Sequence, residues 1–368
     1  MSRADRLPGA ERLKGLQGQP LAWHIALGIV AAAVLYLVTS SVSLYDNTII
    51  SEIAWYAIAI AGLSVLTGVS GQISLGHGAF MAVGAYGAGL MMEHFRLPLI
   101  VPILVGIAVA TVLGAVVGLP ATRLRGPYLA GVTLALALAA QDLPTKFSSL
   151  FNGDTGIIVN QATPPGGVNP ERWLAWISLF GAIVTMIVLA NFMKSRYGRA
   201  LKAVRDDDIA AQASGLNPNR MRVLAFALAA GTAGLSGGLF ALWSGIVNPN
   251  SFSLFLSIQL LAGMVIGGAG SLVGAWWGAL ALVYVPQWTN SVTSHFSSVS
   301  AITANVQDAI FGLLIIVVMM AAPTGIQGWL SGGYRRLRRG RSRTELEPVL
   351  PLDLDLSSTS TAPERTRP

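Results

Sequence analysis

Residues 194–222, KSRYGRALKAVRDDDIAAQASGLNPNRMR, form a polar segment in a chain that is otherwise apolar almost throughout. Five basic residues come first in this polar segment, the last of them Arg205, and three aspartates follow at 206–208. Cations stabilise the C-terminal end of a helix, whereas an aspartate stabilises the first turn of the next one. The order therefore predicts a basic helix that ends near Arg205 and a short helix over 209–214, with Gly215 as its C′ residue and Pro218 preventing continuation.

Alanine and serine give the predicted short helix a smooth face that suits close docking in a groove of another protein. A connection between two membrane spans needs only a turn, so a helix here favours a docking function for the polar segment. The alternative is a solvated charged loop without a partner.

The composition predicts an integral membrane protein. Hydrophobic residues make up 53% of the 368 residues and charged residues only 11%, with a mean hydropathy of +0.61. Soluble domains carry about 25% charged residues, so this chain could not cover a surface that faces water. The absence of cysteine excludes disulfides, thiol chemistry and cysteine-ligated metals.

Apolar stretches predict an all-α polytopic fold with about ten transmembrane or partial helices. Several are short or interrupted by glycine, which is typical of partial or re-entrant spans. Glycines recur at helical spacing in 231–238 and 263–278, which predicts close helix packing there. The expected spans are 21–40, 49–67, 75–92, 99–119, 128–142, 173–193, 223–246, 254–267, 273–288 and 306–322.

The basic residues predict the orientation of these spans. If the N-terminus is cytoplasmic and the spans alternate, all of the 24 lysines and arginines except Arg96, Lys146 and Arg172 lie inside. The positive-inside rule therefore favours a chain with both termini in the cytoplasm. This orientation divides the chain into a cytoplasmic segment 1–20, a transmembrane domain 21–330 with an external loop 144–172, and a cytoplasmic tail 331–368.

The cytoplasmic tail is basic at its start and then has a disordered composition. The run RRLRRGRSR at 335–343 directly follows a predicted span. That position fits contact with anionic lipid headgroups much better than contact with nucleic acid.

A solute path is predicted near the glycine-rich stretch GQISLGHGAFMAVGAYGAGL, residues 71–90. Glycines there let a helix break and expose backbone groups to a cavity, which Gln72, Ser74, His77 and Gly78 would line. The alternative is that His77 is a packed or capping side chain. No metal site and no catalytic residues are predicted, and the chain contains no P-loop to bind a nucleotide.

Five stretches resemble, in the same order, the LivM-type permeases of branched-chain amino acid ABC importers. They begin SGQISLGHG at 70, TRLRGPYLAG at 122, GRALKAVRDDD at 198, NPNSFSLFLS at 248 and IFGLLIIVV at 310. The resemblance covers roughly residues 53–329.

The resemblance implies a bacterial inner-membrane permease subunit for branched-chain amino acids. Its implied partners are a LivH-type permease, two cytoplasmic ATPase subunits and a periplasmic or extracellular solute-binding protein. ATP and Mg would be used by the ATPases, with no cofactor bound by this chain. The polar segment corresponds to the loop that contacts the ATPase, with an isoleucine where that loop usually has glutamate. The implied coupling residues are Arg199, Arg205, Asp207, Asp208, Ala210, Ala211 and Gly215.

Two alternatives concern the solute and the transport class. The first is that the permease carries urea, short amides or other small organic solutes, as related systems do. The second is a different class of transport protein, an ion-coupled secondary carrier or a channel. Within the permease interpretation, Gly215→Val and Ala211→Glu are expected to leave insertion intact and to disrupt ATPase association. Gly215→Val would distort the loop, whereas Ala211→Glu would add bulk and charge on the face expected to dock. Arg205→Ala is expected to have a smaller effect.

Overall fold

A computed structural model of the chain describes residues 42–294, except 96, 125 and 160–163, together with residues 39, 312–313, 320 and 325–330. Two predicted spans and both terminal segments lie outside the described residues, apart from residues 39, 312–313 and 320. They are the spans 21–40 and 306–322 and the segments 1–20 and 331–368.

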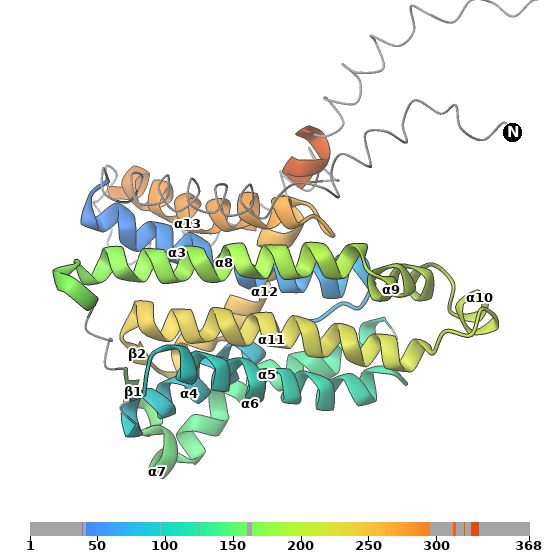
Figure 1. Ribbon diagram of the computed structural model, residues 1–368, viewed down its shortest axis with the longest axis horizontal. Helices are drawn as coiled ribbons and strands as arrows, with labels where there is room; N and C mark the ends of the chain where they lie inside the picture. The colour runs from blue at the N-terminus through green and yellow to red at the C-terminus, as the bar shows by residue number, and fades with distance from the viewer. Residues whose placement is uncertain are drawn as a thin grey trace, which may run out of the picture. The chain divides into compact units, whose positions relative to one another are not determined.

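The described part of the chain is almost wholly α-helical, as predicted, and its long helices run side by side (Figure 1). Short connections contain the 3₁₀ turns η2 (Gly153–Thr155), η3 (Pro165–Gly167) and η4 (Pro249–Phe252). The helices are α3 (Leu44–Leu63), continued by the π-helical η1 (Ser64–Val69), α4 (His77–His94), α5 (Ile100–Ala121), α6 (Pro127–Lys146), α7 (Ser148–Phe151), α8 (Pro170–Lys194), α9 (Arg196–Asp206), α10 (Asp208–Ala213), α11 (Pro218–Ser244), α12 (Leu254–Gly267) and α13 (Leu272–Ser294).

Four of the described helices are long and apolar enough to cross a membrane, namely α3 with η1, α5, α8 and α11. This confirms a polytopic membrane protein. The predicted spans 75–92, 128–142 and 273–288 are helical as well, in α4, α6 and α13. Helix α12 has 14 residues, which corresponds to about 21 Å, shorter than a hydrocarbon core of about 30 Å.

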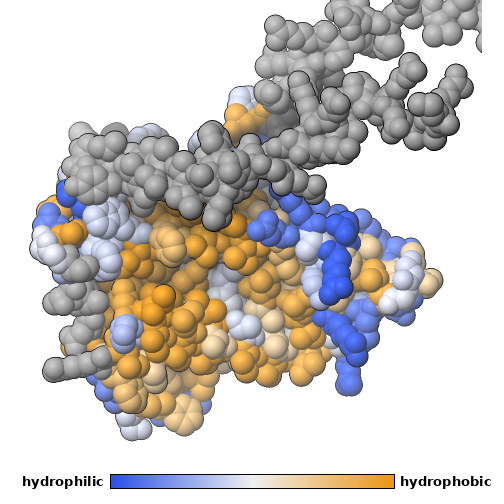
Figure 2. Space-filling model, viewed as in Figure 1, coloured by the Kyte–Doolittle hydropathy of each residue, from blue (hydrophilic) through white to orange (hydrophobic). Residues whose placement is uncertain are grey.

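Helices α3 and α11 lie inside the bundle. Of the residues in the apolar stretch of α3–η1, 83% are buried, and of those in α11, 61%, against 28% for α5 and for α8. Helix α11 packs against α4 and α5, and α3 packs against α8 and α13. The exposed faces of α5 and α8 are apolar, and Figure 2 shows hydrophobic surface along the helices with hydrophilic surface at the end that carries α9.

Glycines set the distance between the inner helices, as the spacing predicts. A Cβ atom on Gly84 would lie 2.3 Å from Gly234 Cα, and one on Gly237 would lie 1.9 Å from the Met81 carbonyl oxygen. Between α12 and α13, a Cβ on Gly267 would lie 2.0 Å from the Gly274 oxygen. These backbones therefore touch directly, which is how membrane helices associate without larger side chains between them.

A two-strand pairing joins the connections at one end of α8 and α11. Strand β1 (Ile157–Ile158) is antiparallel to β2 (Ile246–Val247), with Ile157 opposite Val247 and Ile158 opposite Ile246. The polar segment lies at the opposite end of these two helices (Figure 1). The predicted loop 144–172 and the polar segment are thus at opposite ends of the helices; which end is cytoplasmic stays a prediction.

Candidate functional site

The polar segment folds into two short helices, as predicted, with boundaries within a residue or two of those expected. Helix α9 begins after Ser195, whose hydroxyl accepts hydrogen bonds from the backbone N–H groups of Tyr197 (3.2 Å) and Gly198 (3.4 Å). Leu201 and Val204 are buried against the rest of the chain. The charged residues of α9 therefore lie on its outer face.

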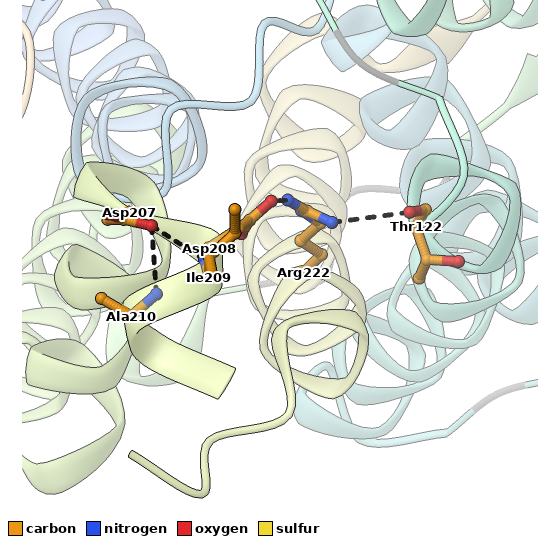
Figure 3. A network of polar contacts seen from close by, with 6 residues as sticks. All are labelled: Thr122, Asp207, Asp208, Ile209, Ala210 and Arg222. Atoms are coloured by element: carbon orange, nitrogen blue, oxygen red, sulfur yellow. Dashed lines mark hydrogen bonds and ion pairs between the residues drawn. The ribbon is translucent and has the colours of Figure 1, made fainter. Parts of the chain in front are cut away.

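Asp207 separates α9 from α10 and caps the second helix. Its Oδ1 accepts hydrogen bonds from the N–H groups of Ile209 (2.8 Å) and Ala210 (3.1 Å), as Figure 3 shows. A carboxylate at this place satisfies N–H groups that have no partner within the helix and lies at the positive end of its dipole. The middle aspartate of the three is thus the N-cap.

Gly215 closes α10 in the left-handed backbone conformation, with φ at +80°. Its N–H donates to the Gln212 oxygen at 2.9 Å, and the Leu216 N–H donates to the Ala211 oxygen at 3.0 Å. This pair of bonds is a Schellman motif. The prediction that Gly215 is the C′ residue is confirmed, with Ser214 at the C-cap.

The outward face of α10 differs from the expected one. Ile209 is 80% exposed, and Ala210, Gln212 and Ala213 are exposed with it, whereas Ala211 is only 3% exposed. Ala211 and Asp208 lie one helical turn apart on the side that faces this chain. The expectation that Ala211→Glu would place a charge on the docking face is therefore wrong, because that glutamate would be forced into the contact between α10 and its own protein.

An ion pair fixes α10 to the bundle. Asp208 Oδ2 accepts from Arg222 Nη2 on α11, and both side chains are 14% exposed. Arg222 Nη1 also donates to the Thr122 carbonyl oxygen at the end of α5, at 3.5 Å (Figure 3). In the sequence Arg222 contributes only to the predicted cytoplasmic charge, and nothing in the pattern distinguishes it from the exposed Arg220.

Arg205 connects the polar segment to the end of α3. Its Nη1 donates to the Gly68 carbonyl oxygen at 2.7 Å, while Nε and Nη2 donate to Asp206 Oδ1 at 3.0 and 2.9 Å. A cavity of about 380 Å³ lies beside this contact. It is lined by three connections that meet here, residues 70–73, the end of α5 with the start of α6, and residues 204–209, together with Arg222.

The predicted path residues lie in the connection between η1 and α4 and at the start of α4. The chain leaves helical conformation between η1 and α4, as predicted, and Gln72 there lines the cavity. Ser74 and His77 are fully buried; His77 Nε2 lies 3.0 Å from the Ala59 carbonyl oxygen, and the Gly78 N–H donates to Ser257 Oγ at 3.0 Å. His77 is thus a packed residue at the start of α4, and a part for these side chains in a solute path stays a prediction.

Of the other coupling residues, Arg199 makes a local contact only, in which Nη1 donates to the Lys194 oxygen at 2.8 Å. Among the described residues no group of three histidine, cysteine or acidic side chains is placed to hold a metal ion.

Comparison with known proteins identifies the family. The family described as branched-chain amino acid transport system / permease component matches residues 45–319. The high-affinity branched-chain amino acid transport system permease protein LivM of Salmonella typhimurium is 29% identical over 347 residues, which cover 87% of this chain and 78% of that one. LivM of Escherichia coli K12 is 29% identical over 328 residues, or 82% of this chain and 73% of that one.

A second type of permease in these systems is also similar. LivH of Salmonella typhimurium is 25% identical over 294 residues, which cover 74% of this chain and 91% of that one. The family match spans most of the chain, including the polar segment and, but for Leu44, the four long apolar helices of the described residues. The chain therefore belongs to the family of permease components of branched-chain amino acid transport systems.

Proposed function

We propose that this chain is the transmembrane permease subunit of an ATP-driven importer that carries branched-chain amino acids across a bacterial inner membrane. One observation carries the docking part of this proposal. Helix α10 is capped at both ends, is tied to α11 by the Asp208–Arg222 pair, and holds Ile209 with 80% of its surface exposed. An apolar side chain held outward on a rigid support is what an interface anchor requires.

The proposed partners are two cytoplasmic ATPases, a LivH-type second permease and an external solute-binding protein. Helix α10 is the proposed docking site for an ATPase. The LivH relative supports pairing of two related permeases, because this chain is similar to both types. The apolar exposed faces of α5 and α8 suit lipid and a second membrane subunit.

In this mechanism the chain performs no covalent step. ATP and Mg are bound by the ATPases, whose closure moves α10 and α9 as a unit and re-aims the spans from outward-open to inward-open. A secondary carrier or channel is the competing class. Reconstitution of this chain alone distinguishes them, because a carrier or channel transports without the ATPases.

We expect deletion of this permease from its host to reduce uptake of leucine, isoleucine and valine at low external concentration to background. The substrate prediction rests on the family and on the similar LivM proteins. Uptake of radiolabelled urea and acetamide is measured in parallel, since a loss there would favour the alternative solutes. Unchanged uptake of all three amino acids would refute the assignment.

The proposed orientation predicts which sites react with a membrane-impermeant maleimide. The natural chain has no cysteine, so single cysteines can be introduced without removing others. Arg12→Cys and Ser342→Cys are expected to be protected in intact cells and Asn160→Cys to be labelled. Lys202→Cys serves for the polar segment, because Ser195 caps α9 and is best left unchanged. Labelling at Lys202→Cys in intact cells, before permeabilisation, would contradict the orientation.

A further inference from the structure

Arg205 makes a bond between two regions far apart in the sequence. The Gly68 oxygen that accepts from it belongs to η1, the last turn of the α3–η1 helix. Carbonyl groups at a helix C-terminus have no partner in a following turn, and they lie at the negative end of the helix dipole. The Arg205 guanidinium supplies both the missing hydrogen-bond donor and a positive charge at this negative end of the helix.

The side chain of Arg205 also lies directly on the backbone of the next residues. Gly71 has a φ of +74°, and a Cβ on it would lie 2.7 Å from Arg205 Cγ. Only glycine meets both the backbone and the space requirement at this position. The stem and the charged group of Arg205 thus hold η1 and its exit together.

Gly68 also lies directly against the turn between α12 and α13. A Cβ on Gly68 would lie 2.2 Å from the backbone nitrogen of Gly270, in the turn between α12 and α13. Backbone atoms that touch directly pass a displacement on, because no side chain lies between Gly68 and Gly270 to adjust. A shift of Arg205 therefore reaches the α12–α13 turn through Gly68.

The chain that follows Gly71 leads into α4. The Leu75 N–H donates to Thr133 Oγ1 on α6 at 3.0 Å, two residues before α4 begins at His77. Residues 70–76 thus connect η1 with both α4 and α6. Asp206 accepts two hydrogen bonds from Arg205 and so orients its guanidinium toward Gly68.

We infer that Arg205 is the positioning residue that transmits movement of α9 and α10 to η1, and through it to α4 and to the α12–α13 turn. This inference rests on the proposed function, since it needs ATPases that move α10. It also revises the expected smaller effect of Arg205→Ala: the short helix and its Asp208–Arg222 ion pair stay intact in this variant, but the hydrogen bond from α9 to η1 is lost.

The experiment uses the complete importer, with both permeases, the ATPases and the binding protein, in proteoliposomes. Arg205→Ala and Arg205→Lys are compared with Lys202→Ala, an exposed cation on the same helix. We measure co-purification of the ATPases, basal ATP hydrolysis, its stimulation by loaded binding protein, and leucine uptake. Basal hydrolysis and co-purification report docking, whereas stimulation and uptake report transmission.

Arg205→Ala is expected to keep its ATPases and basal hydrolysis but to lose stimulation and uptake by about tenfold or more, as for loss of a charge-assisted hydrogen bond. Arg205→Lys keeps the charge without the planar fork and is expected to give intermediate values. Lys202→Ala should match the wild type.

Wild-type stimulation and uptake in Arg205→Ala would overturn the inference, as would loss of the ATPases from the complex, which would make Arg205 a docking residue. Failure of both Arg205 variants to accumulate would assign the residue to folding and overturn it as well. If the wild-type complex shows no ATP-dependent uptake, the proposed function fails instead.

Discussion

Alanine in place of Gly237 is expected to prevent the permease from accumulating in the membrane. The added Cβ would lie 1.9 Å from the Met81 oxygen and 2.9 Å from the Ala85 nitrogen, both backbone atoms of α4. Overpacking costs about 1–3 kcal/mol where side chains can adjust. Backbone atoms of a packed helix cannot, so α4 and α11 must separate and we expect a cost above about 3 kcal/mol, a large part of a stability of about 5–15 kcal/mol.

Quantitative immunoblotting of membranes and thermal unfolding in detergent measure this effect. The matched control is Gly131→Ala, because Gly131 is exposed on α6 and a Cβ there meets no atom within 4 Å. The control should be as abundant as the wild type or slightly more stable, since alanine favours a helix over glycine. Equal abundance and melting temperature for Gly237→Ala and the wild type would disprove the close α4–α11 contact.

Ile209→Asp is expected to abolish ATP-driven uptake while the permease remains at normal abundance. Ile209 is 80% exposed, so the change costs the isolated chain little. In the proposed complex it replaces an apolar anchor by a charge that must lose its water, and loss of a central anchor typically costs about 2 kcal/mol or more. We therefore expect ATPase association to weaken by about 30-fold or more, since 1.4 kcal/mol corresponds to a factor of ten.

The control for this variant is Ile158→Asp, the same substitution at another exposed isoleucine, 68% exposed, at the opposite end of α8 and α11. ATPase pull-down, membrane abundance and uptake are measured together. Normal association and uptake in Ile209→Asp would favour the alternative, in which the polar segment is a solvated loop without a partner.

Gly215→Val tests the same helix from its other end. Nothing lies within 4 Å of a Cβ there, so only the φ of +80° opposes the substitution. A β-branched residue in this conformation is strained by roughly 1–3 kcal/mol, which releases the Schellman bonds. Uptake should fall in Gly215→Val and survive in Gly215→Asn, because asparagine tolerates the left-handed region.

The parts of the site that the sequence predicts correctly are those determined by neighbouring residues. The capping aspartate and the helix-ending Gly215 depend on hydrogen bonds spanning two to five residues, so a short pattern contains them, although it does not say which aspartate of 206–208 is the N-cap. The helix at Leu254–Gly267 likewise follows from a continuous apolar run.

The remaining features depend on contacts between distant segments. Helical periodicity groups Asp208 with Ala211 but does not say whether that face turns inward or outward. The sequence therefore predicts Ala211 on the docking face, whereas the structure buries Ala211 and exposes Ile209. The Arg205–Gly68 bond joins residues 137 positions apart. Strands of two residues, such as β1 and β2, are too short for an alternating pattern to show.

The pairing of β1 with β2 imposes an order on biosynthesis. When β1 leaves the ribosome, its partner strand has not been made, because α8 and α11 lie between them in the chain. The strands can meet only after both helices have crossed the bilayer and brought their ends together, and closing such a loop carries an entropic cost that the finished bundle offsets. Until then Ile157 and Val247, both fully buried in the folded chain, face water. Resistance of the segment around β1 to a protease on its own side of the membrane would therefore mark the moment when insertion of the central helices is complete.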